Sequence, residues 1–181
     1  YGFMSGDMNN FNPIMWVDHT PMQPNYDQPG YHVNEDMADT AIRWISMLKA
    51  SAHKKPFAMV WATGAVHAPH QAPREWRERF RGQFDMGYDE AREIILERQI
   101  DMGIVPKGTK LAPRDDEIPT WASLNDDEKA LYARQMEAFA AQLAYSDYEF
   151  GRIVDYLEQI GELDNTLIIF NRHSDIKHVL H

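Results

Sequence analysis

Twice in this chain, a segment with the apolar spacing of an amphipathic helix is followed by a short run of apolar residues. Apolar side chains recur every three or four positions in residues 34–49, and the apolar run at residues 57–62 follows. The same spacing in residues 125–160 precedes the run at residues 166–170. Short apolar runs between amphipathic helices are typical of parallel strands that helices cover on both faces. The sequence therefore predicts an α/β fold, a mostly parallel sheet flanked by helices, with both runs as interior strands.

Capping residues mark the ends of the two long helices. Asn34 is the predicted N-cap of the first, because two acidic residues follow it and favour the positive end of the helix dipole. Asn125 and Glu128 have the spacing of a capping box at the start of the second. Gly161 is suited to end that helix, since glycine readily takes up the left-handed conformation after a last turn.

The remaining segments are shorter or irregular. Residues 74–80 and 88–102 are predicted helices. The glycines and prolines of residues 103–124 forbid a long helix there, so we expect a loop that Trp121 anchors to the body. Residues 1–33 are predicted to form loops with one short strand.

Composition excludes several classes of function. The chain has 181 residues, a net charge of −10 and no cysteine. The acidic surplus argues against nucleic-acid binding, and the lack of cysteine excludes disulfides, thiolate metal sites and a cysteine nucleophile in this chain. No apolar run approaches the ~20 residues that a membrane span needs. The sequence does not predict an oligomeric state.

A loop with two histidines follows the first apolar run. His67 and His70 lie just beyond residues 57–62, and Pro69 and Pro73 stiffen the loop by fixing φ. In open α/β sheets, ligands gather at the loops that leave the carboxyl ends of strands. Imidazole donates or accepts protons near neutral pH, which suits catalysis. The loop is therefore the candidate site, and the alternative is a pair of ordinary loop histidines.

Two other charged features have structural interpretations. Four arginines lie within eight residues, at Arg74, Arg77, Arg79 and Arg81. We interpret them as a solvated helix face with weak ion pairs, and anion binding is the alternative. Asp147 lies among small and aromatic residues of the long helix, and we interpret it as a helix–loop contact, not a catalytic acid.

Taken together, these features resemble the formylglycine-dependent arylsulfatases of the alkaline-phosphatase-like superfamily. The resemblance covers nearly the whole chain, and the order and spacing of its pieces carry it. The pieces are Tyr1-Gly2-Phe3, Gly30-Tyr31-His32-Val33-Asn34-Glu35-Asp36, Lys55-Pro56-Phe57, Gly64-Ala65-Val66-His67-Ala68-Pro69-His70-Gln71-Ala72-Pro73, Trp121-Ala122-Ser123-Leu124, Tyr132-Ala133-Arg134-Gln135-Met136-Glu137, Asp147-Tyr148-Glu149-Phe150-Gly151-Arg152 and Asp164-Asn165-Thr166-Leu167-Ile168-Ile169. The resemblance implies an alkaline-phosphatase-like fold and a partial domain, with residues 1–181 as the central part of a sulfatase catalytic domain.

The resemblance also implies a chemistry. Arylsulfatases hydrolyse sulfuric esters with a formylglycine nucleophile, and a calcium ion (magnesium is a variant) holds the sulfate oxygens. The family histidine of the strand-end loop matches His67, which is therefore the expected catalytic and substrate-binding residue. His70 is expected to have a packing or rim role. The substrate would be a small-molecule or glycan sulfate ester, and members of the family are often periplasmic or secreted.

The chain departs from the family pattern at both ends. Its serines do not begin the [CS]-x-[PA]-x-R motif from which formylglycine is made, so the nucleophile and the first metal-binding aspartates are expected before Tyr1. The Asp-Asn-Gly turn expected after Phe170 is replaced by Asn171-Arg172-His173-Ser174-Asp175-Ile176-Lys177. Histidine and serine are poor calcium ligands, so the metal ligands stay unassigned. The family's later lysine and C-terminal subdomain are also missing, and we expect residues 1–181 alone to be inactive.

Two alternatives remain open from the sequence. One is a phosphatase or phosphodiesterase of the same superfamily, with a Thr or Ser nucleophile and two zinc ions. The other is a non-catalytic fragment that binds zinc or nickel through its histidines, His67, His70, His173, His178 and His181. A piece of a larger sheet would also leave strand edges and apolar faces unpaired, so we expect the isolated chain to aggregate.

Overall fold

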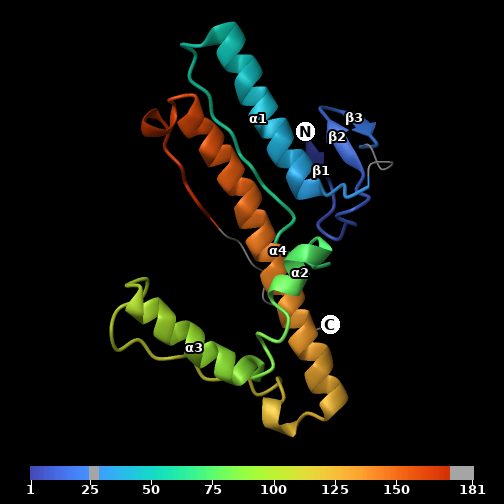
Figure 1. Cartoon of the computed structure of the whole chain (residues 1–181), viewed down its shortest axis with the longest axis vertical. Helices are drawn as coiled ribbons and strands as arrows, with labels where there is room; N and C mark the ends of the chain where they lie inside the picture. The colour runs from blue at the N-terminus through green and yellow to red at the C-terminus, as the bar shows by residue number, and fades with distance from the viewer. Residues whose placement is uncertain (25–28, 172–181) are drawn as a thin grey trace.

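The computed structural model describes residues 1–24 and 29–171 and shows an elongated molecule (Figure 1). Its body is a pair of helices, α1 (Val33–Ala52) and α4 (Asp126–Gln159), which lie side by side. Buried alanines of α1 approach buried Ile153 and Leu157 of α4 and form the largest apolar cluster. Among the described residues, no helix combines the length and hydrophobicity that crossing a bilayer would require.

Helix α4 confirms the prediction of one long helix with a capping box. The Asn125 side chain accepts a hydrogen bond from the backbone N–H of Glu128, and the Glu128 side chain accepts one from the backbone N–H of Asn125. Beyond the helix, Gly161 has a φ of +71°. The predicted apolar face is wrong in part, because Leu131 and Leu143 are exposed.

Helix α1 begins two residues earlier than predicted and has a different N-cap. The cap is His32, whose Nδ1 accepts a hydrogen bond from the backbone N–H of Asn34 at 3.1 Å. Asn34 is instead a buried residue of the first turn. The prediction failed because the N-cap acceptor is an imidazole nitrogen, which tertiary contacts hold in place. The usual N-cap acceptor is the oxygen of a short polar side chain.

The two apolar runs are not the interior strands that the sequence predicts. Residues 57–62 and 166–170 run back as extended chain along α1 and α4, but neither is paired in a sheet within the described residues. Alternate side chains of residues 57–62, among them Phe57 and Trp61, pack on the helices. The other faces are open, with Val60 92% and Ile169 79% exposed. The parallel pairing and two-sided burial that we predicted are therefore absent from this part of the chain.

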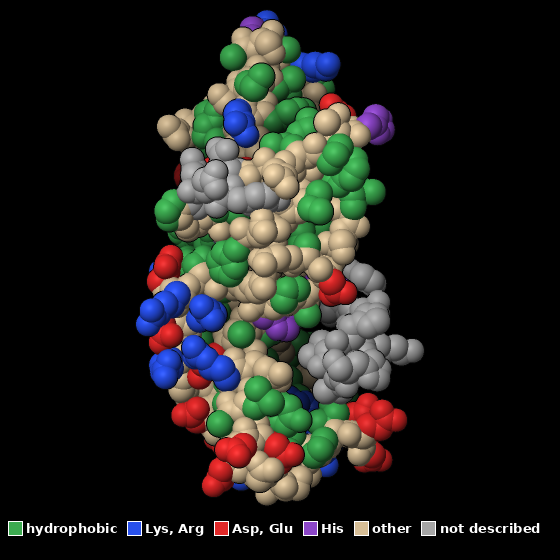
Figure 2. Space-filling view, turned by 90° about the vertical axis from the view of Figure 1, so that its right-hand side faces the viewer, with side chains coloured by type: hydrophobic (Ala, Val, Ile, Leu, Met, Phe, Trp, Pro, Cys, Tyr) green, Lys and Arg blue, Asp and Glu red, His purple; other side chains and the backbone are tan. Residues whose placement is uncertain are grey.

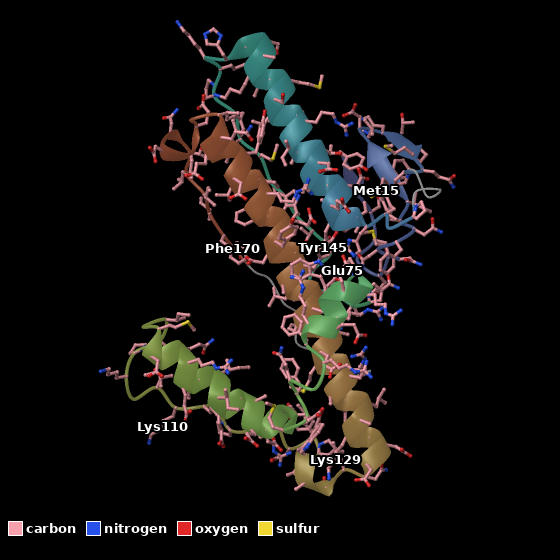
Figure 3. All side chains as sticks on the ribbon, in the orientation of Figure 1. Met15, Glu75, Lys110, Lys129, Tyr145 and Phe170 are labelled. Carbon is pink, nitrogen blue, oxygen red and sulfur yellow. The ribbon has the colours of Figure 1, made fainter. Side chains whose placement is uncertain are left out.

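A small antiparallel sheet occupies the N-terminal segment instead. It pairs β1 (Gly2–Phe3), β2 (Met15–Val17) and β3 (Thr20–Met22) in that order, where the sequence predicted one strand. Its centre is Met15, which is fully buried against the first turns of α1 and is labelled in Figure 3. These strands were missed because two or three residues are too few to show a period.

The central segment contains two helices joined by turns. α2 (Arg74–Arg79) packs on α4 through Trp76 and through Phe80, the residue that follows the helix. α3 (Gly87–Asp101) projects from the body near the start of α4 (Figure 1). The loop after α3 is irregular and contains the short helix η1 (Trp121–Ser123). Trp121 contacts Gly87 and Tyr88, so it anchors the loop to α3 and not, as predicted, to the helical body. A last short helix, η2 (Leu163–Asn165), follows α4.

Candidate functional site

His67 lies where its loop meets the N-terminal segment. The backbone N–H of His67 donates to the carbonyl of Gly64 at 2.8 Å, which closes the turn that presents the ring. A Cβ built on Gly6 would lie 3.3 Å from His67 Nε2, so a glycine there permits the close approach. The Asp7 carboxylate lies 3.3 Å from His67 Nδ1. The site is therefore assembled from segments about sixty residues apart in sequence.

The hydrogen bonding of His67 fixes which ring nitrogen carries a proton. Nδ1 lies 2.7 Å from the carbonyl oxygen of Ala68. A carbonyl only accepts hydrogen bonds, so Nδ1 must donate. Nε2 is then the nitrogen left for chemistry: it accepts in the neutral ring and donates in the protonated ring. The side chain is 46% exposed, so an external group can reach it.

His70 has the packing role that we predicted. Its Nε2 lies 3.2 Å from the carbonyl oxygen of Val66 and therefore donates to it. The ring packs edge-on against Phe139 of α4, with centroids 5.2 Å apart. Burial lowers the pKa of His70, which favours the neutral ring. His67 and His70 donate through different nitrogens to different carbonyls, so the two rings are fixed separately.

Asn10 clamps the histidine loop to the N-terminal segment. It is 3% exposed. Its backbone N–H donates to Oε1 of Gln71 at 2.7 Å, and its side-chain amide donates to the carbonyl of Pro69 at 3.1 Å. Its own carbonyl accepts from the N–H of Val33, at the start of α1. One buried residue thus ties the loop to the helix.

His32 is a second link between the same parts. Its Nε2 donates to the carbonyl of Gln71 at 2.8 Å, while Nδ1 caps α1. The ring packs edge-on against Phe11 and Tyr145. Burial lowers the pKa of His32 to about 4, although the bond to Gln71 opposes the shift. His32 is therefore neutral at pH 7, with its single proton on Nε2.

A polar cavity of about 330 Å³ lies where α1, α2 and α4 meet. Glu75 and Tyr145, labelled in Figure 3, mark its position. It is lined by Glu35, Glu75, Trp76, Arg79, Tyr145, Tyr148, Glu149 and Arg152. Two of its charged side chains pair with each other, because Arg152 bonds to Glu149 at 2.6 Å, and Arg152 also bonds to Asp39 of α1.

This ion-pair network is a brace between helices α1 and α4. Glu149 is 2% exposed, whereas Asp147 is exposed, and the helix–loop contact that we predicted for Asp147 is not seen among the described residues. Burial and the neighbouring Glu149 carboxylate raise the pKa of Tyr145. The same two causes, in the same order, raise the pKa of Glu35. The network bridges the two helices, because Arg152 of α4 bonds to Asp39 of α1.

Comparison with known proteins identifies the family of the chain. The family model named Sulfatase matches residues 2–175. This chain belongs to the sulfatase family. An arylsulfatase of Klebsiella aerogenes is 31% identical over an alignment of 178 residues, and the match covers 94% of this chain and 38% of that protein. An uncharacterized sulfatase of Schizosaccharomyces pombe is 37% identical over 131 residues, or 72% of this chain and 24% of that protein.

A solved structure shows the same fold at low identity. The chain superposes on yidJ of Bacteroides fragilis, which is named as a sulfatase, with a TM-score of 0.56 and 19% identity. The match covers 86% of this chain and 28% of that one. Our chain thus spans well under half the length of these sulfatases.

The described residues do not form the calcium site expected for a sulfatase. Within residues 1–24 and 29–171, no three His, Cys, Asp or Glu side chains come together as metal ligands would. Near His67 the structure places one carboxylate, that of Asp7. Ser174 and Asp175, the positions nearest to the expected ligands, lie outside the described residues, as do His173, His178 and His181. No chemical step is therefore assigned to a metal.

The sequence predicted His67 as a residue of this site but not the residues that hold it and its loop in place. His67 came from its place in the loop motif. Asp7, Asn10 and the capping role of His32 were missed, because lone polar residues in irregular segments carry no periodic signal. Gln71 appeared only as a letter of the family motif. The supporting residues could be recognised only as hydrogen-bonding partners of the loop, and these partners are distant in sequence.

Proposed function

We propose that this chain is the central part, residues 1–181, of the catalytic domain of a sulfuric ester hydrolase. His67 is the proposed catalytic and substrate-binding histidine. The observation that carries the proposal is the His67 ring itself, with Nδ1 committed to Ala68 and the side chain 46% exposed. Membership of the sulfatase family supports the reaction class. The formylglycine nucleophile and the calcium ligands are proposed to come from outside the described residues.

The chemistry follows from the Nε2 atom. When the ring is protonated, Nε2 donates a hydrogen bond to a sulfate oxygen or a proton to the leaving oxygen of the ester. Either contact stabilises the negative charge that develops as the ester bond breaks. Asn10 and His32 hold the loop by hydrogen bonds, so the loop loses less conformational entropy when substrate binds. The substrate class is a sulfate ester of an aryl group or a glycan.

We also propose that residues 57–62 and 166–170 become parallel strands when the rest of the domain is present. Each run follows a long helix and returns along it, so both point the same way (Figure 1). Each has an apolar face without cover in the described residues, shown by Val60 and Ile169. Two parallel strands with a helix before each are the start of an α/β sheet.

The direct test uses a longer protein that carries this segment together with a formylglycine motif. His67→Ala should lower kcat/KM for 4-nitrophenyl sulfate by roughly 10²- to 10⁴-fold, the usual range for loss of a general acid or base. His70→Ala is the matched control and should cost much less, because His70 packs on Phe139. The change is measured by steady-state kinetics, with circular dichroism to confirm folding.

The isolated chain provides a second measurement. Residues 1–181 should show no turnover of the same aryl sulfate, since the chain has no cysteine and no serine in the required motif. Turnover by the purified chain that disappears with His67→Ala would contradict the assignment of the nucleophile. Equal activity of His67→Ala and the unchanged longer protein would contradict the role of His67.

A further inference from the structure

The N-terminal segment lies along the histidine loop from its start to its end. A Cβ built on Gly64, where the loop begins, would lie 3.6 Å from the side chain of Asn10. Near the end of the loop, Asn10 donates to the carbonyl of Pro69 and to Oε1 of Gln71. Figure 2 views the molecule from the side on which the strands of this segment lie in Figure 1, and histidine side chains reach the surface there. The segment therefore forms a wall beside the His67 ring.

Gly6 lies against one face of the His67 imidazole. A Cβ built on Gly6 would lie 3.3 Å from Nε2 and 3.4 Å from both carbons bonded to it, Cδ2 and Cε1. An atom in line with the Nε2 lone pair would be clearly farther from the two carbons than from Nε2, so the three similar distances place this Cβ over the ring face. Gly6 therefore supports the ring at its Nε2 end and leaves the in-plane approach to Nε2 uncovered.

The lack of a side chain at position 6 is what allows this contact. The φ of Gly6 does not lie in the left-handed region, so the backbone conformation does not require glycine. A Cβ at these distances would be tighter than ordinary contacts, so alanine would push the ring aside by a few tenths of an ångström. The glycine is therefore explained by the His67 ring and not by the backbone.

Asp7 lies at the opposite edge of the same ring. Its Oδ1 is 3.3 Å from Nδ1, the nitrogen that also donates to the carbonyl of Ala68 at 2.7 Å. The carboxylate attracts the ring whenever the imidazole is protonated, which is the form that donates through Nε2. The Asp7 side chain is 78% exposed, so solvent screens this attraction and its effect is modest.

We infer that Gly6 and Asp7 are positioning residues for His67. Gly6 supports one face of the imidazole and Asp7 attracts its Nδ1 edge, so the ring keeps one orientation and Nε2 one direction. Position matters because a misplacement of about 1 Å can cost about 10²-fold in rate. The inference rests on the proposed function for the role of His67, but the placement of the ring can be measured without turnover.

The first test labels His67 in the 181-residue chain. Diethyl pyrocarbonate reacts with the unprotonated nitrogen of a neutral imidazole, which is Nε2 in His67. Gly6→Ala places a methyl group beside this atom and should slow the labelling of His67 by roughly threefold or more. His70 is the reference in the same peptide, because its ring packs on Phe139. Mass spectrometry of the peptide measures both labels.

Gly2→Ala is the matched control for this substitution. A Cβ on Gly2 would meet no neighbouring atom within 4 Å, and its φ also lies outside the left-handed region. The control should therefore leave the labelling of His67 unchanged. Circular dichroism should show both variants folded, since neither glycine is buried.

The second test measures turnover in the longer protein that carries a formylglycine motif. Gly6→Ala should lower kcat/KM for 4-nitrophenyl sulfate about tenfold, because a shift of the ring misaligns Nε2. In a His67→Ala background the same substitution should have no further effect, since Gly6 acts through the ring. A merely structural role would lower activity in both backgrounds.

Asp7→Asn tests the carboxylate in the same longer protein. It should lower kcat/KM by roughly two- to fivefold at low salt, and the loss should shrink as added salt screens the charge. The control is Asp18→Asn, which removes the same charge from the turn between β2 and β3. Asparagine tolerates the φ of +53° at that position, so the control should leave kcat/KM nearly unchanged.

The outcomes separate this inference from the proposed function. Equal labelling of His67 in Gly6→Ala and in the unchanged chain, or additive losses from Gly6→Ala and His67→Ala, would overturn the role of Gly6. A loss in Asp7→Asn that does not depend on salt would overturn the role of Asp7. If His67→Ala leaves turnover unchanged, the proposed function fails, while the labelling experiment still decides whether Gly6 positions the ring.

Discussion

At the scale of single residues, buried polar side chains connect the parts of the candidate site. His32 caps α1, bonds to Gln71 and packs on Phe11 and Tyr145. The partners fix the role of each ring nitrogen: Nδ1 accepts from the backbone N–H of Asn34, and Nε2 donates to the carbonyl of Gln71. Protonation of Nδ1 would place a positive charge in a buried site and remove the cap. The ring therefore makes the structure sensitive to acid.

Stability should fall as pH decreases from about 6.5 to about 4. The pKa of His32 is lowered to about 4 in the folded chain, so the unfolded chain binds more protons in this window. Between pH 7 and pH 4.5 the free energy of unfolding should drop by about 2 kcal/mol from this residue. The raised pKa of Glu35 acts in the opposite direction as pH falls, so a variant is needed to isolate the histidine.

His32→Asn provides that comparison. Asparagine is a good N-cap that does not titrate, so it keeps the cap of α1 and removes the acid-sensitive group. Urea unfolding at pH 7.0 and pH 4.5 should show a pH-dependent loss about 2 kcal/mol smaller in the variant than in the unchanged chain. The same loss in both proteins would show that His32 is not the group responsible.

At the scale of elements, helix ends could be predicted where the signal is local. The capping box of Asn125 and Glu128 uses side chains within one turn, and the structure contains it as predicted. The start of α1 depends on a ring that Gln71 holds from 39 residues away. Its cap could not be predicted because its bonding partners come from another part of the chain.

The junction of α3 with η1 should depend strongly on one glycine. Gly87 has a φ of +84°, and a Cβ there would lie 2.2 Å from the Trp121 ring. Gly87→Ala should therefore add a steric clash to the cost of a left-handed alanine, and lower stability by roughly 3 kcal/mol or more. Tryptophan fluorescence during urea unfolding reports the change.

Gly103→Ala is the matched control for that substitution. Gly103 has a similar φ of +72° but open space where its Cβ would lie. Its replacement should therefore cost about 1 kcal/mol, from backbone strain alone. Equal destabilisation by both changes would mean that the contact with Trp121 contributes nothing.

At the scale of the whole molecule, uncovered apolar faces are the main feature. Residues 57–62 bury one face against the helices and leave the other open, with Val60 92% exposed. The apolar side chains of residues 166–170 are exposed, with Ile169 at 79%. Exposed extended segments with unpaired edges tend to pair with another chain. We therefore expect the isolated chain to self-associate.

Two lysines on those faces should reduce the association. Val60→Lys with Ile169→Lys places charge at the open faces without removing core side chains, and should shift the chain towards the monomer in sedimentation velocity. The control, Ile95→Lys with Met102→Lys, charges exposed positions of the α3 region and should have little effect. A monomeric unchanged chain with a sharp, cooperative melt would contradict the prediction.

The sequence by itself determined the helices, the loop that presents His67 and the family, because periodicity, capping patterns and motif order are properties of neighbouring residues. Only the tertiary structure decided that His32 caps α1, that Asn10 clamps the loop, and that Arg134 of α4 pairs with Glu78 of α2. Those contacts join residues tens of positions apart, and no local pattern encodes them. The two apolar runs also illustrate this limit of the sequence. Their composition favours strands, but a strand in a sheet requires a neighbouring strand as a hydrogen-bonding partner. The described residues do not supply that neighbour.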